Sequence, residues 1–131
     1  MGTVPLLSDD ELSAEARAVF AEIRAARGTD YINNFWRALA HDPATLRATW
    51  DRLGAVMAPG ALDPLTKEML YIAVSTANGC SYCIHSHTAA AKAKGMTPAQ
   101  HGELLAVIGM AMQTNGLVTG LQVEVDEVFK A

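Results

Sequence analysis

The chain has 131 residues, half of them hydrophobic, and its 14 acidic and 10 basic residues give a formal net charge of −4. This length fits one domain with a modest core, and the lack of a basic run argues against nucleic-acid binding. No stretch approaches the roughly 20 apolar residues that a membrane span needs, and the N-terminus does not resemble a signal peptide. We therefore expect a single domain over residues 1–131, in the cytoplasm and without a membrane partner.

Helix-start and helix-stop signals predict three helices in the first half of the chain. Ser8-Asp9-Asp10-Glu11 has the spacing of a capping box, so a first helix should begin there and end at Gly28. Apolar residues at helical spacing predict a short second helix around residues 32–39. A third helix should begin at Asp42-Pro43, an acidic N-cap followed by proline, and stop at Pro59-Gly60.

The second half of the chain predicts three more helices. Asp63-Pro64 repeats the N-cap signal and predicts a helix over residues 64–77. Another should run from residue 79 or 80 to 94, and a last one from 98 to between 115 and 120. The tail, residues 123–129, alternates weakly and is expected to be extended. The sequence thus predicts an all-α fold, a compact bundle of about six helices without a significant sheet.

Two cysteines and a histidine fall together in this second half. Cys80 and Cys83 are the only cysteines, two residues lie between them, and His87 follows one helical turn later. On one helix these three side chains lie on one face. A helix N-terminus favours a thiolate at Cys80, and His87 can accept a thiol proton. Glu68 can orient His87 if the preceding helix packs antiparallel, which gives a nucleophile, a base and an orienting group.

Other interpretations of this cluster stay open. Tyr82 and His85 lie off the shared face, and we assign no role to His85. The cysteines could be buried packing residues. They could instead bind zinc with His87 and either Glu68 or His85, although ligands on a single helix face would make a cramped site.

The spacing of Glu68, Cys80, Cys83 and His87 resembles the signature of the alkylhydroperoxidase D family, within the carboxymuconolactone decarboxylase-like superfamily. The resemblance is strongest over residues 63–120. It implies an all-helical fold that assembles as a homo-oligomer, a trimer or a hexamer.

The same resemblance implies thiol-dependent reduction of small hydroperoxides without haem, flavin or metal. By this analogy Cys83 is the peroxidatic thiol, Cys80 is the resolving thiol, and His87 with Glu68 relays protons. Oxidation of Cys83 to a sulfenic acid would be followed by a Cys80–Cys83 disulfide, which a thiol reductant of unspecified identity would open.

One position departs from the family pattern, because the namesake proteins have a histidine where this chain has Tyr82. The proton relay then lacks one member.

Two other functions stay open. One is a cofactor-free decarboxylase of the same superfamily, which does not need the cysteine pair. The other is a redox-sensing or metal-binding protein without turnover.

Overall fold

Helices make up all the regular structure in residues 2–130, the part of the chain that the computed structural model describes. Within these residues there is no strand, and the prediction of an all-α fold with about six helices is confirmed. The α-helices are α1 (Ala14–Arg27), α2 (Asn34–Leu39), α3 (Pro43–Met57), α4 (Pro64–Ala77), α5 (Ser81–Ala93) and α6 (Pro98–Leu121), and the 3-10 helices are η1 (Asp9–Glu11) and η2 (Glu127–Phe129).

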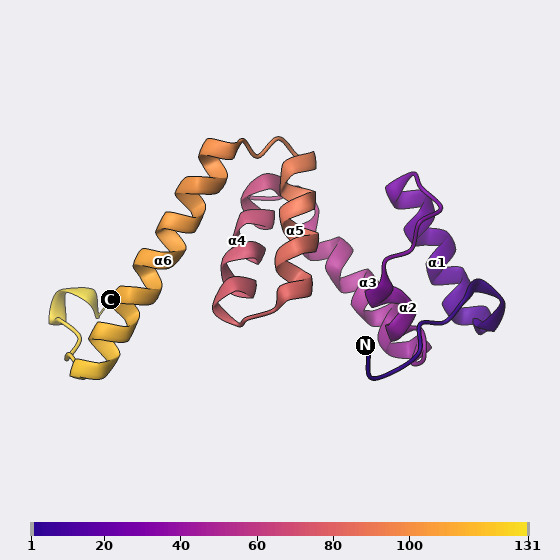
Figure 1. The fold of residues 1–131 in the computed structure, drawn as a ribbon, viewed down its shortest axis with the longest axis horizontal. Helices are drawn as coiled ribbons and strands as arrows, with labels where there is room; N and C mark the ends of the chain where they lie inside the picture. The colour runs from indigo at the N-terminus through magenta and orange to yellow at the C-terminus, as the bar shows by residue number, and fades with distance from the viewer. Residues whose placement is uncertain (1, 131) are drawn as a thin grey trace. The chain divides into compact units, whose positions relative to one another are not determined.

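The described residues form two compact units, one ending at Ala58 and the other beginning at Pro59. The first contains α1, α2 and α3, and the second contains α4, α5 and α6 (Figure 1). The single domain over residues 1–131 stays a prediction.

An apolar core holds the first unit together. The Trp36 ring of α2 meets the Trp50 ring of α3 edge-on, with the ring centroids 5.6 Å apart. Burial of large apolar side chains is the main stabilising contribution to such a unit. The buried residues of this core are Leu12, Ala16, Val19, Phe20, Ile23, Ile32, Trp36, Ala40 and Leu46.

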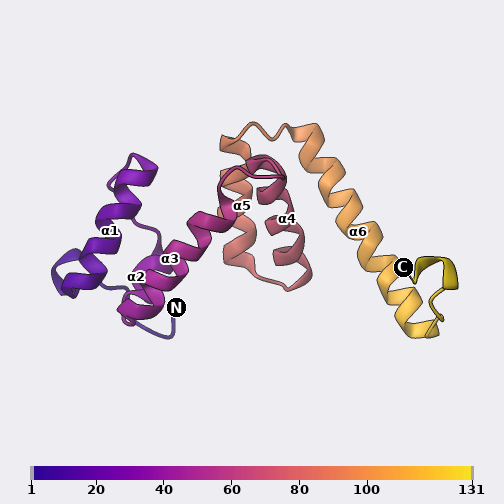
Figure 2. The ribbon, with the colours of Figure 1, turned by 180° about the vertical axis from the view of Figure 1, so that it is seen from behind.

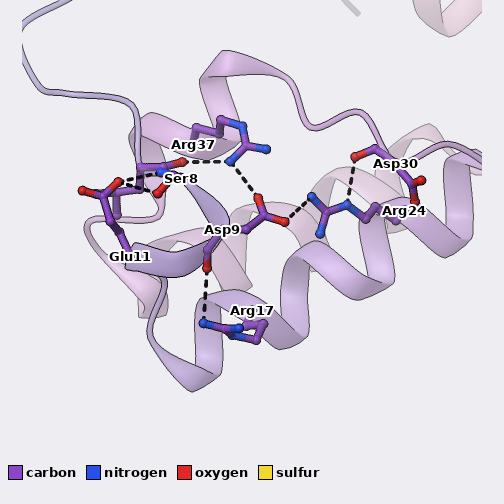
Figure 3. A network of polar contacts seen from close by, with 8 residues as sticks. Ser8, Asp9, Glu11, Arg17, Arg24, Asp30 and Arg37 are labelled. Atoms are coloured by element: carbon purple, nitrogen blue, oxygen red, sulfur yellow. Dashed lines mark hydrogen bonds and ion pairs between the residues drawn. The ribbon is translucent and has the colours of Figure 1, made fainter.

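Two arginines bind Asp9 and so hold the N-terminal segment against this unit (Figure 3). The guanidinium groups of Arg24 and Arg37 lie 2.7 and 3.0 Å from the two carboxylate oxygens, and Arg37 also donates to the carbonyl of Leu7. The hydrogen bond from Arg37, with that from Arg24, lowers the pKa of Asp9. Arg17 donates to the Asp9 carbonyl at 3.2 Å. The contacts of Asp9 with these three arginines therefore stabilise the N-terminal segment of the first unit.

The first α-helix begins later than the sequence predicted. Ser8 and Glu11 do interact, with the Ser8 N–H 2.7 Å from the Glu11 carboxylate, but they enclose only the single turn of η1. Leu12 is then extended and buried, and α1 starts after Ser13, whose hydroxyl accepts the N–H of Ala16. The expectation of one continuous helix is wrong because burial of Leu12 and a second N-cap interrupt it.

In the second unit α4 and α5 lie side by side (Figures 1 and 2). Residues early in α4 contact residues late in α5, so the two helices are antiparallel. The start of α6 packs against α4, and the buried core consists of Ile72, Ala91, Met96 and Ile108. The predicted starts of α4 and α6 are confirmed: Asp63 and Thr97 accept the N–H groups of Thr66 and Gln100.

Helix α6 is longer and more exposed than the other helices. It continues without interruption to Leu121, and after Ile108 none of its side chains is buried. By length and composition alone it could cross a membrane, which corrects the expectation that no stretch approaches such a span. Composition of this kind is weak evidence, since polar residues such as Gln113 and Asn115 interrupt it.

The tail after α6 is not extended throughout. Residues 123–126 have no regular structure and η2 covers Glu127–Phe129. The weak alternation of this segment does not produce a strand because no neighbouring strand in residues 2–130 offers a hydrogen-bonding edge.

Candidate active site

One face of α4 supplies three side chains to the site. Glu68, Tyr71 and Ser75 are three and seven residues apart, a spacing that puts them on one side of a helix. Glu68 and Ser75 are the two buried polar side chains among the described residues, each 5% exposed. Glu68 was predicted from the sequence and the other two were not, although their spacing from Glu68 indicates a shared helix face.

A Schellman turn connects α4 directly to the cysteines. Gly79 takes the left-handed conformation, with φ 69°, and the N–H of Cys80 donates to the carbonyl of Ser75 at 2.9 Å. Cys80 is thereby the N-cap of α5 and not a residue of its first turn. Its sulfur accepts the N–H of Cys83 at 3.3 Å.

The two cysteines are half-buried free thiols with opposite electrostatic environments. The thiol of Cys83 and the backbone N–H of Cys83 both donate to the Cys80 sulfur, and these hydrogen bonds lower the pKa of Cys80. The hydrogen bond to Cys80 and partial burial raise the pKa of Cys83, and a hydrogen bond with Ser75 opposes this increase. Cys80 is therefore the thiol of the pair that loses its proton more readily.

The predicted pairing of Glu68 with His87 is present. A Glu68 carboxylate oxygen lies 2.7 Å from Nδ1 of His87. Because a carboxylate can only accept, Nδ1 carries the hydrogen, and in the neutral imidazole Nε2 is the acceptor. His87 is one turn beyond Cys83 on α5, so both face the same side of the helix.

Two further residues complete the surroundings of His87. The Tyr71 ring stacks on the imidazole, with centroids 3.6 Å apart and planes 19° from parallel. Lys94, at the C-cap of α5, places its ammonium nitrogen 3.1 Å from the second oxygen of Glu68. Lys94 was not predicted as a site residue, although it lies seven residues beyond His87 and hence on the same face.

Tyr82 and His85 lie on the outer side of α5, as the helical projection predicted. Tyr82 is 46% exposed, and Nδ1 of His85 donates to the carbonyl of Ser81 at 2.8 Å. With Ser81 and Ser86 they line an open hollow on the surface.

The geometry does not support a zinc site. In the described part of the chain, no three His, Cys, Asp or Glu side chains are grouped so that they could hold a metal ion. Glu68 is engaged by His87 and Lys94, not by the cysteines.

Comparison with known proteins assigns the family. The profile of the Carboxymuconolactone decarboxylase family matches residues 43–123, which include all four predicted site residues. The chain belongs to this family. Its structure is similar to the crystal structure of the alkylhydroperoxidase AhpD core from Rhodospirillum rubrum ATCC 11170, with a TM-score of 0.95. The two sequences are 63% identical, and the match covers 100% of this chain and 98% of that one.

A second relative within this superfamily carries an activity in its name. The alkyl hydroperoxide reductase AhpD of Solibacter usitatus (strain Ellin6076) is 31% identical over 121 residues, covering 86% of this chain. The chain spans 63% of the length of that relative. The AhpD-like fold predicted from the cysteine signature is confirmed.

Proposed function

We propose that this protein is a thiol-dependent peroxidase that reduces hydroperoxides through Cys83 and Cys80. The names of the two relatives support this proposal. The observation that carries it is the placement of Cys80 and Cys83 at the N-terminus of α5, where the Cys83 N–H donates to the Cys80 sulfur, with His87 one turn beyond Cys83 and 2.7 Å from Glu68. A thiol and a carboxylate-oriented base are the groups that a cysteine-based reduction requires.

The proposed first step uses Cys83 as the nucleophile, because it lies on the same face as His87. Its raised pKa means that Cys83 needs a base, and Nε2 of His87 is the acceptor that takes the thiol proton. The Cys83 thiolate then attacks the terminal peroxide oxygen and the O–O bond breaks. Cys83 becomes a sulfenic acid, and the alkoxide takes the proton from His87 and leaves as an alcohol.

The proposed second step uses Cys80 as the resolving thiol. Its sulfur accepts the backbone N–H of Cys83, which favours the thiolate, and this thiolate attacks the sulfenic sulfur of Cys83 and forms a disulfide. The hydroxide that leaves takes a proton from solvent and becomes water. An external dithiol reduces the disulfide by exchange and is itself oxidised.

Single serine variants test these roles. The reduced protein should consume tert-butyl hydroperoxide with dithiothreitol as the reductant, and Cys83→Ser should abolish consumption. Without dithiothreitol, Cys80→Ser should still react once and accumulate a Cys83 sulfenic acid, detected by dimedone labelling and mass spectrometry. A sulfenic acid on Cys80 in the Cys83→Ser protein would reverse the two roles, and consumption unchanged in both variants would refute the proposal.

The histidines offer a matched control. His87→Gln should slow peroxide consumption about a hundredfold, the usual contribution of a positioned base. His85→Gln changes the same residue type on the same helix but away from the thiols, so its rate should equal that of the unmodified protein.

The family also contains enzymes of another kind, since its name refers to a decarboxylase. A decarboxylase activity would leave both thiols idle. Activity on a carboxymuconolactone that survives complete alkylation of the cysteines would favour this second candidate over the peroxidase.

We further propose that the protein is a homo-oligomer, a trimer or a hexamer, in the cytoplasm. The exposed apolar side chains of α6 support the association of copies, because monomeric soluble proteins rarely expose apolar patches of large area. These side chains are Leu105, Val107, Met110, Met112, Leu117, Val118 and Leu121.

A further inference from the structure

The buried Glu68 carboxylate has two cationic or potentially cationic neighbours. One oxygen accepts from Nδ1 of His87 at 2.7 Å and the other from Nζ of Lys94 at 3.1 Å. The Glu68 side chain is 6% exposed, whereas that of Lys94 is 40% exposed. A buried carboxylate is stable as an anion only if a positive group or several hydrogen bonds compensate its charge.

We propose that Lys94 is a positioning residue whose ammonium group neutralises Glu68 and so leaves the His87 imidazole uncharged and able to accept a proton at Nε2. The inference rests on the proposed peroxidase function for the use of His87 as a base. The charge relation among the three groups is independent of that function.

The reason is the charge balance of the cluster. With Lys94 in place, one ammonium balances one carboxylate and the imidazole need carry no charge. Without it, the nearest group that can compensate Glu68 is His87 itself, which would bind a proton and become an imidazolium. An imidazolium cannot take the proton of Cys83.

The end of α5 positions the ammonium group of Lys94 beside Glu68. Lys94 is the C-cap residue, and its N–H donates to the carbonyls of Ala90 and Ala91. The chain turns away at Gly95, which has a φ of 97°. A cation at this position is also favoured by the partial negative charge of the helix C-terminus.

Lys94 brings an ammonium group to Glu68, at 3.1 Å. From α4 the imidazole meets Tyr71, which stacks on it, and from α5 the thiol of Cys83 shares its face. Helix α6 packs on α4 and carries two titratable residues, His101 and Glu103. Neither is bonded to Glu68 within residues 2–130.

Proton NMR titration of the reduced protein tests the inference directly. The His87 imidazole signal, assigned by its loss in His87→Gln, should change at a pH about one unit higher in Lys94→Met than in the unmodified chain. Lys94→Arg keeps the positive charge and should restore the original midpoint. Lys92→Met, two residues earlier on the same helix, removes one charge but no contact to Glu68 and should leave the midpoint in place.

An unchanged or lower midpoint in Lys94→Met would overturn the inference, as would an equal shift in Lys92→Met. The pH profile of peroxide consumption supplies the second readout: its acidic limb should move up by the same amount in Lys94→Met. If the NMR midpoint moves while the unmodified protein consumes no peroxide, the inference about Lys94 stands and the proposed function fails.

Discussion

At the scale of single residues, the two thiols differ because each is the other's neighbour. Hydrogen bonds from the thiol and the backbone N–H of Cys83 lower the pKa of Cys80, whereas the hydrogen bond to Cys80 raises the pKa of Cys83. Cys80 is thereby the thiol that loses its proton first as the pH rises. Cys83 loses its proton only at higher pH, or when a base removes it.

This asymmetry predicts the order of alkylation. Iodoacetamide reacts with thiolates, so at pH 7.5 Cys80, with its lowered pKa, should be modified before Cys83. Raising the pH further should reduce the difference, because Cys83, whose pKa is raised, then begins to lose its proton as well. Peptide mass spectrometry after brief exposure measures both sites.

The Cys80→Ser variant is the control for this order. Removing the Cys80 thiolate removes the main cause of the raised pKa of Cys83, so Cys83 should be alkylated faster than in the unmodified protein. Modification of Cys83 first in the unmodified chain would contradict the account of the resting charge.

At the scale of elements, the turn between α4 and α5 decides where the thiols lie. Gly79 has a positive φ, and its turn leads directly into the N-cap at Cys80. Alanine at this position would meet no atom within 4 Å, so its cost is conformational and not steric. The left-handed conformation costs a non-glycine residue about 1–2 kcal/mol.

Gly79→Ala should therefore lower the free energy of unfolding by about 1 kcal/mol and slow alkylation of Cys80 at neutral pH, because the cap geometry is disturbed. Urea unfolding followed by circular dichroism measures the first effect. Gly102→Ala is the matched control: it lies inside α6 with no atom within 4 Å, and alanine there should stabilise by about 0.5–1 kcal/mol. Equal effects at the two glycines would contradict this explanation.

At the scale of the whole molecule, the apolar surface of α6 needs an explanation that the described chain does not supply. Only 6% of its most apolar window is buried. If this surface joins copies of the chain, light scattering after size exclusion should give a mass of three or six protomers. Charges on Val118 and Leu121, introduced by replacing both with Glu, should yield monomers.

A matched substitution separates contact from charge alone. Val128→Glu changes a side chain that is 84% exposed in the tail, outside α6, and should leave the oligomer intact. A monomeric unmodified protein would refute the oligomer proposal. Co-sedimentation of that monomer with phospholipid vesicles would assign α6 to a membrane instead.

Local rules predicted much of the fold and part of the site. The N-caps at Asp42 and Asp63 were predicted correctly because capping depends on residues within one turn. The Glu68–His87 contact was predicted from the assumption that two consecutive helices pack antiparallel. The prediction of where α1 begins was wrong because Ser8 and Ser13 are both N-caps. Burial of the extended Leu12 separates the turn after Ser8 from the helix after Ser13.

The residues that the sequence did not predict belong to contacts between helices. Ser75, Tyr71 and Lys94 were available by spacing, but their role depends on how α4 and α5 are rotated about their axes. Helical periodicity defines a face and does not say which members of it meet a partner. A thiolate at Cys80 was expected from the helix N-terminus, but the hydrogen bond from the Cys83 thiol, which is the largest cause of the lowered pKa of Cys80, was not.

The central claim is that Cys83 and Cys80 together reduce a hydroperoxide. In the most direct measurement, the fully reduced protein is mixed with a small excess of tert-butyl hydroperoxide without any added reductant. The peroxide consumed and the disulfide formed are then quantified per chain. We expect each chain to consume a single equivalent of peroxide and form one Cys80–Cys83 disulfide, identified by mass spectrometry. Peroxide consumption without disulfide formation, or thiols that remain free after prolonged exposure, would contradict the account.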